Sequence, residues 1–101
     1  MSVVDLVATA AGLPQAWSSR RLGQVGETCV KVLRMDELSV EQESHDADEA
    51  LIVLDGRLEL DVNGTSVSVR AGELYMVPAG TTHAVRPGSH GALVIVESAE
   101  Q

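Results

Sequence analysis

The segment RLELDVNGTSVSVR, residues 57–70, places the tightest constraint on what this chain can fold into. Leu58 and Leu60 lie on one face of a strand and charged residues on the other, because side chains alternate between the two faces. Asn63 and Gly64 then supply the two positive-φ positions of a type I′ turn, and alternating valines follow. The segment is therefore predicted to be a β-hairpin with one buried face.

Other short stretches of the chain show the same β-type pattern. Gly- and Pro-rich turn sequences separate them roughly every eight to twelve residues, a spacing typical of antiparallel sandwiches and barrels rather than βαβ units. Strands are predicted at residues 28–35, 38–45, 50–55, 57–62, 65–70, 73–77, 82–86 and 92–97. We therefore expect an all-β barrel of antiparallel strands.

The chain of 101 residues fits one domain. The barrel core is expected over residues 28–97, with residues 1–27 as an N-terminal extension. Residues 3–11 suit a short helix stopped by Gly12, although an extended segment is also compatible with them. The strand at 50–55, ALIVLD, is apolar on both faces. Its outer face is expected to meet an N-terminal strand, the first helix or a second subunit, so a homodimer is predicted.

Composition excludes several classes of function. The formal net charge is −8, and Arg20-Arg21 is the only adjacent basic pair, so binding to nucleic acid or an anionic membrane is disfavoured. The single cysteine, Cys29, excludes an intrachain disulfide. The N-terminal residues lack a basic region and contain Asp5, and no apolar run approaches the ~20 residues of a membrane span. A cytoplasmic protein is expected.

Two spaced segments contain residue types that bind metals. The first is E-x-H-x-x-x-E-x-x-x-x-x-x-G, with Glu43, His45, Glu49 and Gly56; the second is G-x-x-x-x-x-P-x-G-x-x-H, with Gly72, Pro78, Gly80 and His83. Both segments resemble the two signature motifs of the cupin superfamily, and the predicted hairpin lies between them, where that family places it. The resemblance covers about residues 28–97 and implies a jelly-roll barrel of two antiparallel sheets.

The resemblance also implies a divalent metal. Cupins bind it with two histidines and a glutamate from the first motif and a histidine from the second, so the expected ligands here are His45, Glu49 and His83. Glu43 stands where the family has its first histidine. Since residues two apart on a strand share a face, Glu43 is a candidate fourth ligand beside His45. The alternative is that Glu43 marks a barrel that has lost its metal.

Imidazoles and carboxylates bind Fe, Mn, Ni or Zn, and three protein ligands leave positions free for water or substrate. A second carboxylate favours Mn or Fe over Cu. Two functions stay open at this point. One is a metal-dependent enzyme of oxygenase, isomerase or decarboxylase type acting on a small polar substrate, with no catalytic residue assigned by pattern. The other is a non-catalytic domain that binds or senses a small ligand.

Overall fold

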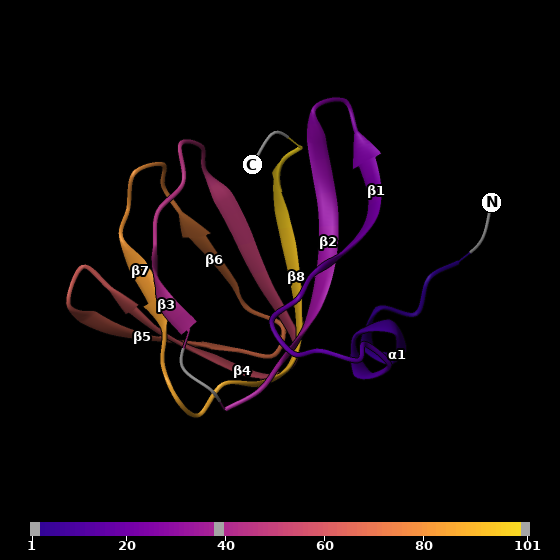
Figure 1. The fold of residues 1–101 in the computed structure, drawn as a ribbon, viewed down its shortest axis with the longest axis horizontal. Coiled ribbons are helices and arrows are strands. Elements are labelled where there is room, and N and C mark those ends of the chain that lie inside the picture. Colours follow the sequence, from indigo (N-terminus) through magenta and orange to yellow (C-terminus); the bar gives the residue numbers. More distant parts are fainter. Residues whose placement is uncertain (1–2, 38–39, 100–101) are drawn as a thin grey trace.

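The structure, a computed structural model, describes residues 3–37 and 40–99 of the chain. One short helix and eight strands make up the described part (Figure 1). In chain order they are α1 (Leu6–Ala11), β1 (Arg20–Val25), β2 (Thr28–Met35), β3 (Val40–Glu43), β4 (Glu49–Val62), β5 (Thr65–Arg70), β6 (Leu74–Val77), β7 (His83–Val85) and β8 (His90–Ser98). No helix among these residues is long and apolar enough to cross a membrane.

The predicted all-β fold is confirmed, and most strands lie where the sequence pattern places them. β2 has the predicted bounds, and β4 and β5 form the predicted hairpin around Asn63 (φ 50°) and Gly64 (φ 85°). The strand predicted at 38–45 is observed as β3, Val40–Glu43, and residues 38–39 lie outside the described part. The sequence did not assign β1, which pairs with β2 through part of the N-terminal extension.

All strand pairs are antiparallel, and the main path through the sheet runs β1-β2-β8-β4-β7-β3. The 14-residue strand β4 joins the two walls of the barrel, because it pairs with β6 and β8 in its first half and with β5 and β7 in its second. It bends at Gly56, whose φ is +75°. A Cβ there would lie 2.0 Å from the carbonyl oxygen of His90, so only glycine allows the strands to approach this closely.

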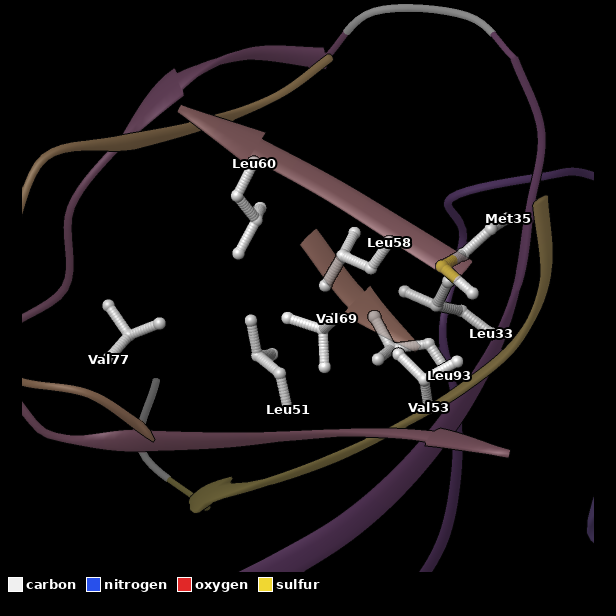
Figure 2. Packing of buried hydrophobic residues seen from close by; sticks show 9 residues of the cluster. All are labelled: Leu33, Met35, Leu51, Val53, Leu58, Leu60, Val69, Val77 and Leu93. Atoms are coloured by element: carbon white, nitrogen blue, oxygen red, sulfur yellow. The ribbon is translucent and has the colours of Figure 1, made fainter. Parts of the chain in front are cut away.

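The bend places the two halves of β4 on opposite sides of the core. Figure 2 shows Leu51 and Val53 from the first half pointing toward Leu58 and Leu60 from the second. We refer to the nine buried residues of this cluster as the aliphatic core: Leu33, Met35, Leu51, Val53, Leu58, Leu60, Val69, Val77 and Leu93. Every side chain comes from an inward-facing position of its strand, as the period-2 pattern predicts.

A second, smaller cluster covers the outer face of β2, β4 and β8. Ala10 of α1 packs there with Val32 and Val94, and the half-buried Ile52 and Leu54 of β4 join them. The outer face of the ALIVLD strand thus meets the first helix, one of the three covers expected from the sequence. Asp5 caps α1 by accepting a hydrogen bond from the backbone N–H of Ala8.

Candidate metal centre

The structure brings Glu43, His45, Glu49 and His83 together; we call them the four-residue cluster. Glu43 is the last residue of β3 and lies opposite His83, the first residue of β7. Glu49 opens β4 and pairs with Val77 of β6. His45 lies in the loop between β3 and β4 rather than on the predicted strand, yet its side chain reaches the same point as the other three.

Two hydrogen bonds join the segments that contribute these residues. The backbone N–H of Gly80 donates to the carbonyl oxygen of His45 at 2.8 Å, and that of Ala79 donates to the carboxylate of Asp48 at 2.8 Å. Both donors belong to the turn that precedes His83. Asp48 of the acidic loop HDADE therefore has a structural role, because its hydrogen bond joins the segments that contain the two motifs. His45 of the same loop faces the cluster.

The donor atoms of the four-residue cluster suit one small cation. One nitrogen or carboxylate oxygen from each residue lies within 4.8 Å of the others. The Nε2 atoms of His45 and His83 are each 3.5 Å from Oε1 of Glu43, and Nε2 of His83 is 3.4 Å from Oε1 of Glu49. These separations exceed a good hydrogen bond, but they match ligand atoms that each sit about 2.1 Å from a shared ion. Two nitrogens and two oxygens therefore fit a divalent metal.

A carbonyl group fixes the orientation of His83. Its Nδ1 atom lies 3.0 Å from the carbonyl oxygen of Thr81. Because a carbonyl only accepts, Nδ1 carries the proton and Nε2 of the neutral ring keeps its lone pair for the cluster. His83 is also 3% exposed, so its ring is surrounded by protein. This arrangement is the one that metal-binding histidines use.

A buried chain of charged groups continues from Glu49 away from the cluster. Burial, followed by a hydrogen bond with Glu97, raises the pKa of Glu49 to about 7. Burial also opposes ionisation of Glu97, but hydrogen bonds with Lys31 and Glu49 outweigh it and lower the pKa of Glu97. Lys31 donates to Glu97 at 2.7 Å, which in turn raises the pKa of the lysine. Glu97 is thus the ionised member of the acid pair.

A cavity of about 170 Å³ opens onto the cluster, and Glu97 lines it as well. The remaining wall is mostly aliphatic, with side chains such as Leu33, Leu51 and Ile95. No arginine is among the described residues that line it. The side chain of Arg34 instead binds the N-terminal segment, where its Nε donates to the carbonyl oxygen of Leu13.

The sequence reasoning did not find Glu97 or Lys31. The signal for both was a charged residue at an inward-facing position: Lys31 shares a strand face with the buried Cys29 and Leu33, and Glu97 ends the run ALVIVE. Trp17 also lines the cavity and was not predicted to do so. His90 is exposed at the start of β8 and is not part of the cluster.

Residues 32–98 match the profile of a protein family described as "Cupin domain". Among curated proteins, quercetin 2,3-dioxygenase of Bacillus subtilis (strain 168) is 40% identical over 53 residues. That match covers 52% of this chain but 15% of the length of the relative.

Solved structures of similar fold cover nearly the whole chain. A cupin-2 domain containing protein from Shewanella frigidimarina superposes with a TM-score of 0.86, at 24% identity over 95% of this chain and 94% of the other. A protein from Neisseria meningitidis gives a TM-score of 0.82, at 20% identity over 96% of this chain and 99% of the other. At these identities the likeness concerns the fold alone.

Proposed function

Because the chain belongs to the cupin superfamily, we propose that it binds one divalent metal ion, Fe, Mn, Ni or Zn, and uses it to act on a small organic molecule. The observation that carries the proposal is the convergence of four ligand-type atoms within 4.8 Å of one another, beside a cavity. His45, Glu49 and His83 are the proposed ligands, with Glu43 as the fourth. When bound, such a metal supplies Lewis acidity or a place where dioxygen and substrate meet.

The chain's own residues supply the rest of the proposed site. Glu97 is a buried carboxylate that lines the cavity beside Glu49, and Lys31 keeps it ionised. The aliphatic wall excludes water from a bound molecule, which strengthens polar interactions inside the cavity. The chemistry we favour is oxygenase-like, since the curated relative with the 40% match is a dioxygenase.

The size of the cavity limits the substrate. An engineered cavity of about 150 Å³ in another protein holds benzene. The cavity here has a volume of about 170 Å³. The substrate proposed for this chain therefore places about one six-membered ring inside the cavity.

Elemental analysis of untagged protein, purified without added metal, tests the proposal. We expect about one Fe, Mn, Ni or Zn per chain in the wild type and none in His83→Ala. Such a result would justify screening single-ring substrates under oxygen. Wild-type protein that stays metal-free after reconstitution with each of these ions would overturn the proposal. The non-catalytic, ligand-binding alternative would then replace it.

We also propose that the protein forms a homodimer through the outer face of the barrel. Leu74 and Met76 of β6 are 56% and 49% exposed, large values for apolar side chains. They lie opposite Ile52 and Ala50 of β4, next to the second apolar cluster. Light scattering should give twice the chain mass for the wild type and the chain mass for Leu74→Glu. A monomeric wild type would contradict the dimer.

A further inference from the structure

The wall of the cavity indicates which class of molecule enters it. Apart from the four-residue cluster and Glu97, the described lining residues are aliphatic except for Trp17 and Ser19. An anionic ligand would face the carboxylates of Glu43, Glu49 and Glu97 with no arginine or lysine in the lining. Lys31 is already paired with Glu97 at 2.7 Å. In the metal-free protein no cationic side chain in the lining offsets these acidic groups for an incoming anion, so the cavity disfavours carboxylates and phosphates.

Trp17 adds one specific polar feature to this apolar wall. Its indole Nε1 atom is buried and has no hydrogen-bond partner among the residues that the structure describes. Buried N–H groups nearly always have a partner, so this donor is a candidate for binding a ligand oxygen. Solvent does not reach the atom in the structure, so the indole must turn toward the ligand to make this bond.

The segment that carries Trp17 is held over β2 by hydrogen bonds. The backbone N–H of Trp17 donates to the carbonyl oxygen of Arg34 at 2.8 Å, and Nε of Arg34 donates to the carbonyl oxygen of Leu13 at 3.1 Å. Trp17 has a φ of 65°, a left-handed conformation that is uncommon for a residue other than glycine. A residue in a left-handed conformation that is tethered through its backbone N–H and lines a cavity is typical of a functional position.

We propose that the cavity selects an uncharged molecule of about one six-membered ring, and that Trp17 recognises an acceptor oxygen on it through its indole N–H. The inference rests on the proposed function only in that both concern the same cavity, and its charge argument applies to the metal-free protein. Trp17 is a specificity-determining residue in this proposal and takes no part in metal binding.

Three probes of similar size separate the contributions of ring shape, acceptor oxygen and charge to binding. Acetophenone has a ring and a carbonyl oxygen, isopropylbenzene has the same shape without the acceptor, and benzoate has acceptors but carries a charge. Because Trp17 is the only tryptophan, ¹⁵N-labelled protein shows one indole N–H resonance. We expect acetophenone to shift this resonance and to bind about tenfold tighter than benzoate in chelator-treated protein.

Trp17→Phe removes the donor and keeps an aromatic ring. It should weaken acetophenone binding about five- to tenfold, the usual effect of one lost hydrogen bond, and change isopropylbenzene binding less than twofold. Ser19→Ala, which removes an exposed hydroxyl from the same lining, is the control and should change neither. An unmoved indole resonance, or equal loss for both probes in Trp17→Phe, overturns the role of Trp17. Tighter binding of benzoate, or no binding of any probe, overturns the ligand class.

Titration of the same proteins with Mn²⁺ keeps this inference apart from the proposed function. Trp17→Phe should bind Mn²⁺ as the wild type does. Loss of Mn²⁺ binding from wild type and variant alike, with the probe results intact, would defeat the metal proposal and leave the ligand class standing.

Discussion

The aliphatic core and the four-residue cluster share the strand β4, but they contribute to the molecule in opposite ways. The core residues Val53, Leu58 and Leu60 are at most 1% exposed, and each such burial stabilises the fold by about 1.5–3 kcal/mol. The cluster holds Glu49 and His83 almost as deeply, at 6% and 3% exposure, although burial disfavours charge. The core therefore supplies stability, and the cluster is held in position by the core.

The largest expected effect separates the cluster from the core. His83→Ala and His45→Ala should each weaken Mn²⁺ or Zn²⁺ binding at least a hundredfold, because each removes a proposed ligand. Both variants should keep the circular dichroism spectrum of the wild type, since neither side chain belongs to the aliphatic core. Calorimetric titration checks the affinity. His90→Ala, the third histidine, is the control, and an equal loss of affinity there would contradict the assignment.

A substitution in the aliphatic core should have the opposite effect, lowering stability while leaving metal affinity nearly unchanged. Met35→Ala should lower the free energy of unfolding by about 2–5 kcal/mol, because it leaves a cavity among well-packed side chains away from the cluster. At a temperature where the variant is folded, its metal affinity should stay within about threefold of the wild type. Val25→Ala, at a 76% exposed position, should cost under about 0.5 kcal/mol. Urea unfolding and metal titration test this. Affinity that falls in step with stability would show that the two regions are not separable.

A smaller effect concerns the pH dependence of stability in metal-free protein. The folded pKa of Glu49, about 7, lies above the ordinary glutamate value. Its stabilising contribution is therefore full below the unfolded pKa of about 4.3 and is lost as the pH rises through 7. The free energy of unfolding should fall by about 1–2 kcal/mol between pH 5.5 and 8.

Glu49→Gln should remove most of that fall, because an amide stays neutral and still donates to Glu97. Glu43→Gln, at a 51% exposed side chain, should leave it unchanged. Denaturation at several pH values measures the effect. Wild-type stability that is constant or rises over this range would refute the assignment to Glu49.

The smallest effect is expected at Glu43, the exposed edge of the cluster. Glu43→His should tighten Ni²⁺ or Zn²⁺ binding several-fold and weaken Mn²⁺ binding, because imidazole is a softer ligand than carboxylate. The gain is limited because an exposed side chain loses rotamer freedom on binding. Competition titrations with the three ions measure it. Unchanged preference among the ions would place Glu43 outside the proposed ligand set.

Features that depend on local sequence could be predicted, and these include most of the fold. Asn63 and Gly64 determine the hairpin turn because both adopt positive φ. The bounds of β2 follow from the alternation of inward- and outward-facing side chains within Thr28–Met35. β1 was missed because Gly23 interrupts it and five of its six residues are exposed, so it shows no clear period-2 pattern. The strand forms because β2 offers a free edge, which is a property of the sheet and not of the segment.

The four cluster residues could be proposed from motif spacing, but their surroundings could not. Glu97 lies 48 positions after Glu49 in the chain. The two meet because β8 pairs with β4 in one particular register. The pair between Lys31 and Glu97 likewise depends on how β2 lies against β8. Trp17 reaches the cavity through a single backbone hydrogen bond to Arg34. Register and long-range hydrogen bonds decide these contacts, and alternation within one segment does not reveal them.

The strand β4 has one further consequence for the cluster. It begins with Glu49 and, after 14 residues in all, ends with Val62, which pairs with His83. The strand leaves the cluster, turns at Gly56 and returns to it. Its length therefore sets the distance between two proposed ligands, Glu49 and His83. Deleting or inserting one residue on either side of Gly56 would turn the inward side chains outward and shift the strand against its partners. The number of residues in β4 is therefore as much a requirement for the site as the ligands themselves.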